Sequence, residues 1–143
     1  MEIKQISVFI ENRKGRLKKA LDTLSKAEIN IRALSLAERA KYGILRLIVS
    51  DNEKAKSVLE ENKFIVKEND VIVVEVPDKP NGLNSILEVL TDADINVEYL
   101  YAFVGKKTDE AIVVMRLENI EDGIKVLKSQ NANLLTKEYI ENL

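Results

Sequence analysis

The chain has 143 residues, and its 22 basic and 24 acidic side chains give a net charge of −2, which offers no electrostatic footprint for nucleic acid. It contains no cysteine and no histidine, which excludes the usual zinc, iron–sulfur and copper sites, disulfides, and catalysis by cysteine or histidine. We therefore expect no metal and no cofactor. No signal peptide and no stretch of 18 apolar residues is recognisable, which predicts a cytoplasmic protein without a membrane span.

The predicted elements begin with a strand in which apolar residues alternate, at Ile6, Val8 and Ile10. After a short polar loop, apolar residues recur at helical spacing, at Leu17, Ala20, Leu21, Leu24 and Ala27. A second strand is predicted at 31–37 and, after a turn at 39–43, a third at 44–50. Asp51 is placed to cap a second helix, and a short last strand is predicted at 64–67.

The second half of the chain repeats the first, with residue n matching residue n + 66. The identical pairs are Leu17/Leu83, Leu21/Leu87, Leu24/Leu90, Ala27/Ala93, Ile29/Ile95 and Asn30/Asn96. After a two-residue insertion in 105–110, the match resumes at an offset of 68. The repeat predicts strands at 72–76, 97–104, 111–117 and 133–135, a turn at 105–110, and a second helix capped by Asn119.

The order βαββαβ, written twice, predicts an α+β protein of two ferredoxin-like units in tandem, residues 1–68 and 69–143. Each unit should have a four-stranded antiparallel sheet with both helices on one face. The core face of the sheets is predicted to carry Ile6, Val8, Ile10, Leu34, Leu36, Leu45, Leu47 and Val49, and Ile72, Val74, Val76, Leu100, Ala102, Val113, Met115 and Leu117.

The opposite face of each sheet is too apolar for a surface in contact with water. It should carry Phe9, Ala33, Ser35, Arg46 and Ile48 in the first unit, and Val73, Tyr99, Tyr101, Phe103, Val114 and Arg116 in the second. Two interpretations stay open, namely packing against another sheet or subunit, and a platform for a ligand or nucleic acid.

The segments 11–17 with 28–31, and 77–97, resemble the ACT domain, the small-molecule sensing module attached to many amino-acid metabolic enzymes. The usual pattern is an acidic or amide residue, any residue, Pro, Gly, any residue and Leu, followed by a Leu-rich helix and a hydrophobic-Asn-hydrophobic strand start. The resemblance covers nearly the whole chain as two tandem copies without a catalytic domain. It implies a free-standing regulatory protein that binds an amino acid, is a homodimer or higher homo-oligomer, and has a metabolic enzyme as a further candidate partner.

The first copy is particularly similar to the serine-sensing ACT domain of phosphoglycerate dehydrogenase. Asn12, Gly15, Leu17 and Asn30 match its pattern, whereas Ile10 stands where that family has His and Lys14 where it has Pro. In the second copy Asp78, Pro80, Leu83 and Asn96 match, but Asn81 occupies the Gly position and Gly82 comes one later.

The loop before each first helix is suited to an amino acid, because the first N–H groups of a helix lack internal partners and attract a carboxylate. A glycine there permits close approach, and an Asn or Asp can accept hydrogen bonds from the ammonium group. The candidate ligand-binding residues are Asn12, Arg13, Lys14, Gly15, Arg16, Leu17 and Asn30 in the first copy, and Asp78, Asn81, Gly82, Leu83 and Asn96 in the second.

Six of these residues also have an ordinary structural interpretation. Gly15 and Gly82 are suited to a turn, Asn12 and Asp78 are common helix caps or turn formers, and Asn30 and Asn96 follow a helix end, where asparagine often adopts the left-handed conformation.

The leading functional hypothesis is a non-catalytic protein that senses an amino acid at these loops and at contacts between ACT units or subunits. The alternative is an assembly or regulatory subunit of an amino-acid biosynthetic enzyme, such as an acetolactate-synthase-like one, with degenerate ligand sites. An RNA-binding module is less favoured because the aromatic residues Tyr99, Tyr101 and Phe103 fall on the second strand. An enzyme is disfavoured because the carboxylates Asp78, Asp92, Asp94 and Glu110 form no convincing pair, and a metallochaperone would need cysteine.

Overall fold

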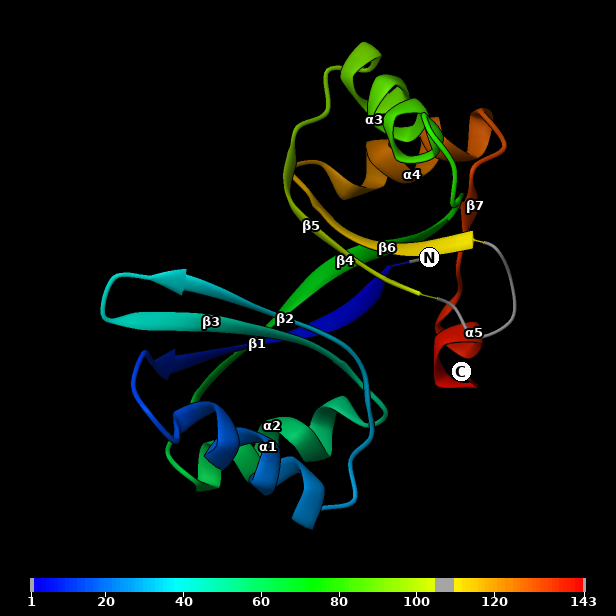
Figure 1. Cartoon of the computed structure of the whole chain (residues 1–143). Coiled ribbons are helices and arrows are strands. Elements are labelled where there is room, and N and C mark those ends of the chain that lie inside the picture. Colours follow the sequence, from blue (N-terminus) through cyan, green and yellow to red (C-terminus); the bar gives the residue numbers. More distant parts are fainter. Residues whose placement is uncertain (1, 105–109, 143) are drawn as a thin grey trace. The chain divides into compact units, whose positions relative to one another are not determined.

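The computed structural model describes residues 2–104 and 110–142. The chain divides into two compact units, Lys4–Asn69, hereafter the N-terminal unit, and Asp70–Leu143 together with Met1–Ile3, hereafter the C-terminal unit. In each unit two helices cover one face of a sheet (Figure 1). This confirms the predicted α+β class with two ferredoxin-like units.

The N-terminal unit is built from β1 (Ile3–Glu11), α1 (Arg16–Lys26), β2 (Ile31–Arg39), β3 (Tyr42–Val49), α2 (Asn52–Glu61) and the first part of β4 (Ile65–Pro77). Its strands lie in the order β2-β3-β1-β4. The central strand β1 pairs antiparallel with β3, and β3 pairs antiparallel with β2. The strand β2 therefore lies at the edge of this sheet.

The C-terminal unit repeats this arrangement with the second part of β4, α3 (Gly82–Asp92), β5 (Val97–Val104), β6 (Glu110–Leu117), α4 (Ile120–Ser129) and β7 (Asn133–Leu134). The strand β6 pairs antiparallel with β4 and β5, and β7 pairs with β4. A short helix, α5 (Lys137–Glu141), which the sequence patterns did not predict, follows and is capped by the hydroxyl of Thr136. Residues 105–109 of the predicted turn lie outside the described residues.

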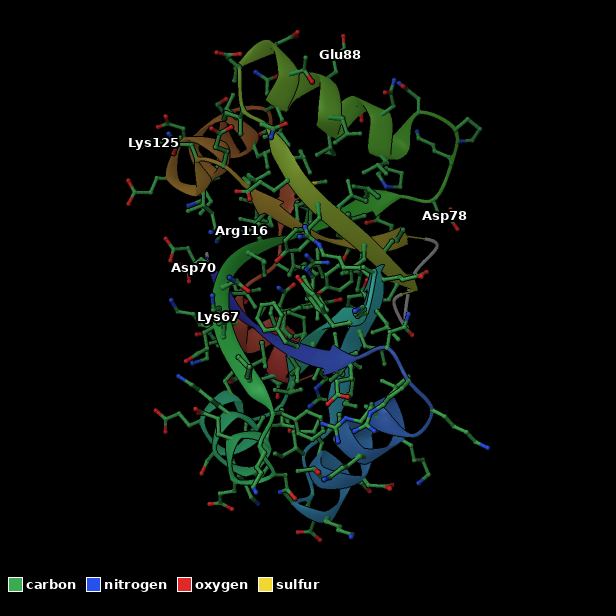
Figure 2. All side chains as sticks on the ribbon, turned by 90° about the vertical axis from the view of Figure 1, so that its left-hand side faces the viewer. Lys67, Asp70, Asp78, Glu88, Arg116 and Lys125 are labelled. Atoms are coloured by element: carbon green, nitrogen blue, oxygen red, sulfur yellow. The ribbon has the colours of Figure 1, made fainter. Side chains whose placement is uncertain are left out.

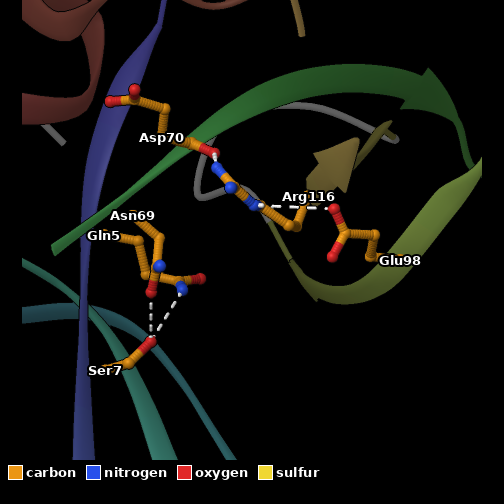
Figure 3. A network of polar contacts seen from close by, with 6 residues as sticks. All are labelled: Gln5, Ser7, Asn69, Asp70, Glu98 and Arg116. Atoms are coloured by element: carbon orange, nitrogen blue, oxygen red, sulfur yellow. Dashed lines mark hydrogen bonds and ion pairs between the residues drawn. The ribbon is translucent and has the colours of Figure 1, made fainter. Parts of the chain in front are cut away.

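The strand β4 belongs to both units. The last strand predicted at 64–67 and the strand predicted at 72–76 form one strand of 13 residues without an interruption. Asn69 contacts Ser7 of β1, whose hydroxyl donates to its amide oxygen at 2.6 Å. Arg116 of β6 donates from Nη1 to the carbonyl of Asp70 at 2.6 Å, and its Nε lies 4.0 Å from Glu98 (Figure 3). Each half of β4 is thereby held by a polar contact within its own unit.

The helices are placed by the apolar spacing that predicted them. Leu24 of α1 and Leu90 of α3 occupy equivalent positions and are both fully buried in the core of their unit. The predicted caps of the second helices are confirmed, because Asp51 accepts from the backbone N–H of Lys54 at 3.0 Å and Asn119 from that of Asp122 at 3.2 Å.

The edge strands differ from the expectation of a fully buried core face. Leu34 pairs with Leu47, and Leu36 with Leu45, so that both share the face of the buried leucines. Nevertheless they are 49% and 47% exposed, and Leu100 of β5 is 36% exposed. The period-two pattern identifies the face correctly, but it does not show that a strand lies at an edge, where neighbouring side chains cover only one flank.

The faces of the sheets opposite the helices are largely buried, as their apolar composition indicated. Ala33, Ile48, Val73 and Val114 are each at most 5% exposed. This face also holds polar side chains that the alternating pattern of the first strand did not predict. Gln5 is fully buried, and its amide nitrogen donates to the hydroxyl of Ser7 at 3.3 Å (Figure 3).

Candidate functional site

The first loop leaves β1 and turns into α1 through Gly15. Gly15 has a φ of 88° at the N-cap position, and no side chain caps the helix. A left-handed backbone at this place is what glycine adopts without steric cost. Space around it is open, because no atom apart from those of its chain neighbours lies within 4 Å of where a Cβ would be. The turn interpretation of Gly15 is therefore correct, and it leaves the start of α1 accessible.

Asn12 attaches the first loop to the turn between β2 and β3. Its backbone N–H donates to the carbonyl of Lys41 at 3.0 Å, and its side-chain Nδ2 contacts the carbonyl of Ala40 at 3.5 Å. Asn12 is thus not a helix cap, since the cap position belongs to Gly15. Beside it, Arg13 forms an ion pair with Glu11 at 2.7 Å.

A cavity of about 260 Å³ lies between the first loop and the end of β2. It is lined by Ile10, Glu11, Asn12, Arg13, Leu17, Leu36, Ala37, Glu38 and Gly43. Three of the predicted ligand-binding residues, Asn12, Arg13 and Leu17, therefore meet at one place. The cavity adds two carboxylates, Glu11 and Glu38, that sequence patterns did not identify. The register of β2 on β3, which pairs Glu38 with Gly43, brings Glu38 to this end of the sheet.

The other residues of the first loop lie elsewhere. Lys14 is exposed, and Gly15 lines a separate open groove between α1 and α2. The guanidinium of Arg16 lies over the ring of Phe64 at 4.8 Å from its centroid, which is cation–π geometry. Arg16 therefore packs against its own unit, where the sequence predicted a ligand contact.

Asn30 does not reach this cavity within one unit. It follows α1, whose 11 residues span about 16 Å, and lies at the opposite end of that helix, next to Ile31 in a second hollow. Its backbone pairs with Ser50, donating to the hydroxyl at 3.0 Å and accepting from the N–H at 2.9 Å. Asn96 is equivalent, and its carbonyl accepts from the N–H of Glu118 at 3.0 Å.

The suggested left-handed cap role of Asn30 and Asn96 is wrong. The residues with positive φ after these helices are Glu28, at 57°, and Asp94, at 59°. Both come two positions earlier in the chain than the asparagines. The amide side chains are consequently not required for the turn.

The second loop is closed more tightly than the first. Asn81, at the N-cap of α3, takes the left-handed role of Gly15 with a φ of 71°. Gly82 is buried, and a Cβ there would collide with the carbonyl oxygen of Pro77. Asn84 donates to the side-chain oxygen of Asn81 at 2.9 Å. Gly82, one position later than the glycine of the family pattern, thus permits the start of α3 to lie close to the carbonyl group of Pro77.

The remaining second-loop candidates lie at the surface or in the core. Asp78 is exposed at the rim of the loop (Figure 2), and Leu83 packs against the core of the C-terminal unit. Asn96 lines an open hollow with Asp94, Glu118 and other polar residues, away from Asp78. Among the described residues, the hollow that Asn96 lines therefore includes none of Asp78, Asn81, Gly82 and Leu83.

One carboxylate pair joins β4 and β6 near the start of the second loop, because Glu110 pairs with Pro77 in the register of the two strands. Glu75 of β4 hydrogen-bonds Glu110 of β6, which raises the pKa of Glu75, and burial and charge repulsion by Glu110 raise it further. Asn133 acts in the opposite direction by a hydrogen bond to Glu75. Within residues 2–104 and 110–142, no group of three or more acidic side chains is arranged to hold a metal ion.

No helix in the described part of the chain is long and apolar enough to cross a membrane.

Comparison with known proteins identifies the fold and a family. The sequence model of a family described as "ACT domain pair" matches residues 1–143. The crystal structure of protein BT0572 from Bacteroides thetaiotaomicron is 39% identical in sequence, with a TM-score of 0.93 over 100% of this chain and 98% of that one. The comparison with proteins of curated function gives no match.

More distant structures share the fold. The regulatory subunit of aspartate kinase from Thermus flavus has a TM-score of 0.64 at 14% identity, covering 90% of this chain and 92% of that one. The corresponding subunit from Thermus thermophilus, in its ligand-free form, has a TM-score of 0.61 at 14% identity, covering 88% and 91%. At 14% sequence identity, these similarities show a shared fold.

Proposed function

Because the chain belongs to the family of ACT domain pairs, which matches all of it, we propose that it is a non-catalytic regulatory protein that binds an amino acid. The proposed domains are residues 1–68 and 69–143, and the proposed location is the cytoplasm. The first loop is the principal site. The cavity that joins Asn12 and Arg13 to Glu11 and Glu38 is the observation that carries the proposal.

The groups around this cavity match the two ends of a zwitterion. The guanidinium of Arg13, held by its ion pair with Glu11, suits a carboxylate, and the carboxylate of Glu38 suits an ammonium group. Leu17 and Leu36 offer an apolar wall for a side chain. Asn12 supplies both a donor and an acceptor, and its link to Ala40 fixes it at the rim.

The asparagines at the strand starts fit the same site if another ACT unit docks on the edge. If the edge strand of a neighbouring unit, its β2 or β5, paired antiparallel with β2, the first residue of that strand would lie beside the end of β2, near Ala40. The Asn30 or Asn96 of that neighbour then comes close to Asn12, which contacts Ala40. We therefore propose that the site is completed at a contact between units of different subunits.

The test is a thermal-shift screen of all twenty amino acids. Ligand at 100 times its dissociation constant should stabilise the protein by about 2.7 kcal/mol. Asn12→Ala and Glu38→Gln should remove the response, whereas Asp78→Ala, at the equivalent place of the second loop, should leave most of it. A shift that survives both Asn12→Ala and Glu38→Gln contradicts the location of the site.

A second candidate is an assembly or regulatory subunit of an amino-acid biosynthetic enzyme whose ligand sites have degenerated. The closure of the second loop by Gly82 against Pro77 favours this for the C-terminal unit. A flat thermal response of the unaltered protein to all twenty amino acids would favour it for the whole chain.

A further inference from the structure

The sheet face opposite the helices of the N-terminal unit carries two aromatic rings in contact. Phe9 lies on β1, and Tyr42 is the first residue of β3, although the sequence patterns placed it in the turn 39–43. The register of β1 on β3 pairs Phe9 with Ile44, so that the two share a face. Tyr42 lies two residues before Ile44 and therefore on the same face, where its ring centroid is 6.4 Å from that of Phe9. Two aromatic residues thus lie together on the two central strands of this sheet.

The rings belong to an exposed surface that also has apolar and basic side chains. Tyr42 is 43% exposed. The ammonium nitrogen of Lys67 on β4 (Figure 2) lies over the ring of Phe9, at 5.7 Å from its centroid. Ile65, two residues from Lys67 along β4 and therefore on the same face, is 65% exposed. Arg39 pairs with Tyr42 across β2 and β3, which places it on this face too. The surface, hereafter the aromatic face, consists of Phe9, Arg39, Tyr42, Ile44, Ile65 and Lys67.

The aromatic face lies on a basic unit, although the chain as a whole is slightly acidic. Residues 4–69, the N-terminal unit, contain 15 basic and 9 acidic side chains, a net charge of +6. The other residues contain 7 basic and 15 acidic side chains, a net charge of −8. Glu11, beside the aromatic face, is neutralised by its ion pair with Arg13 at 2.7 Å. Arg39 and Lys67 therefore give the face a positive charge.

The second repeat has carboxylates where the first has the two rings. With offsets of 66 and 68 residues, Glu75 is the equivalent of Phe9 and Glu110 that of Tyr42. These two carboxyl groups hydrogen-bond each other. The same fold is thus built with an acidic pair at these positions, so the fold itself does not require aromatic residues there. Exposed rings on the first repeat are consequently better explained by a ligand that uses them.

We propose that the aromatic face binds a single strand of nucleic acid. Bases stack on the rings of Phe9 and Tyr42, since every base has a π-face and such stacking tolerates any sequence. Phosphates lie beside Arg39 and Lys67, whose charge complements them. Aromatic side chains on a four-stranded sheet hold unpaired bases in this way in RNA-recognition modules. The contact uses neither loop and requires no amino acid, so it goes beyond the proposed function.

The two grounds on which the sequence disfavoured RNA do not apply to the N-terminal unit. The net charge of −2 describes the whole chain, whereas this unit carries +6. The aromatic residues that fall on a second strand belong to the C-terminal unit, whereas the structure adds Tyr42 to the third strand of the first. A duplex is a less suitable ligand, because its paired and stacked bases present no free π-face to Phe9 and Tyr42.

The test measures the fluorescence anisotropy of labelled oligonucleotides of about eight nucleotides, in buffer without amino acids. A single strand of RNA or of DNA should bind, and the sugar that binds more tightly identifies the natural source. The matching duplex should bind at least about tenfold more weakly, because its bases are not free to stack. The dissociation constant of the single strand should rise roughly five- to tenfold between about 0.05 M and 0.2 M NaCl, as two phosphate contacts imply.

Variants of the aromatic face have matched controls elsewhere in the chain. Tyr42→Leu should weaken the binding of a single strand at least about fivefold, because a stacked base loses its aromatic partner. Tyr139→Leu, which removes an exposed ring from the C-terminal unit, should leave the affinity unchanged. Lys67→Gln should weaken binding and reduce its salt dependence, whereas Lys54→Gln on α2 should do neither. Circular dichroism and melting of each variant verify that it is folded.

Three results contradict the proposal. The first is an unchanged anisotropy of both single strands at about 0.1 mM protein in low salt, where even weak non-specific binding is detectable. The second is equal affinity for the single strand and the duplex, or equal losses for Tyr42→Leu and Tyr139→Leu, because the rings then take no part. The third is a Tyr42→Leu variant that sediments differently from the unaltered protein but binds the oligonucleotide as well, which would mean that the aromatic face contacts a second copy.

Discussion

At the residue scale, the two loops meet the same backbone requirement with different residues. Gly15 provides a left-handed backbone in open space, whereas Asn81 provides it in the repeat and Gly82 provides close approach to Pro77. The motif alone identified glycines in both loops. It did not distinguish a glycine required by its dihedral angle from one required by lack of a side chain.

Gly82→Ala should destabilise the protein by roughly 1–3 kcal/mol, because the added methyl group meets a backbone carbonyl. Gly15→Asn is the matched control and should cost less than about 1 kcal/mol, since asparagine already adopts this conformation at Asn81. Urea unfolding of both variants measures the difference. A larger loss for Gly15→Asn would mean that the first loop is the more constrained one.

The pair of Glu75 and Glu110 predicts a dependence of stability on pH. The folded-state pKa of Glu75 is raised above its ordinary value of 4.5. A carboxyl group of this kind favours the folded state most below its unfolded pKa, and the contribution is lost as pH rises through the folded pKa. Glu75→Gln should therefore stabilise the protein relative to wild type at neutral pH, and the advantage should shrink as pH falls toward 4.5.

Urea unfolding at several pH values checks this, with Glu118→Gln, an exposed carboxylate outside the pair, as the control. A constant difference between Glu75→Gln and wild type at every pH would show that the two carboxyl groups do not interact.

At the element scale, helices and strands were predictable wherever apolar periodicity was strong. The helices α1 and α3, and the caps of α2 and α4, lie where the sequence placed them. Two features were missed for physical reasons. The helix α5 has five residues, which is too short for a periodic signal. Residues 68–71, which separate the strands predicted at 64–67 and 72–76, continue β4.

The continuity of β4 leads to a prediction about cooperativity. Leu24→Ala and Leu90→Ala each remove a fully buried side chain from one unit and should cost about 2–5 kcal/mol. Because β4 is a strand of both sheets, each substitution should lower the midpoint of a single calorimetric transition. Two separate transitions, of which only one moves, would show that the units unfold independently.

At the scale of the whole molecule, the total charge of the chain concealed an uneven distribution of charge between the two units. The net charge of −2 was used to set aside nucleic acid, yet it is the sum of a unit at +6 and a unit at −8. Counting charges within each repeat would have revealed this without coordinates. What the count alone does not indicate is that the basic unit brings Phe9 and Tyr42 together on one sheet face, because strand register arises from pairing between distant segments.

The amino-acid sequence by itself determined the duplicated ferredoxin-like fold, since helix and strand periods and helix caps are local properties repeated at a fixed interval. It also placed Asn12, Arg13 and Leu17 among the candidate ligand-binding residues, and these three line one cavity. Only the tertiary structure decided that Asn30 lies a helix length away, that Glu38 joins the cavity, and that Gly82 closes the second loop. These relations depend on strand register and chain packing, which join residues with no shared local pattern.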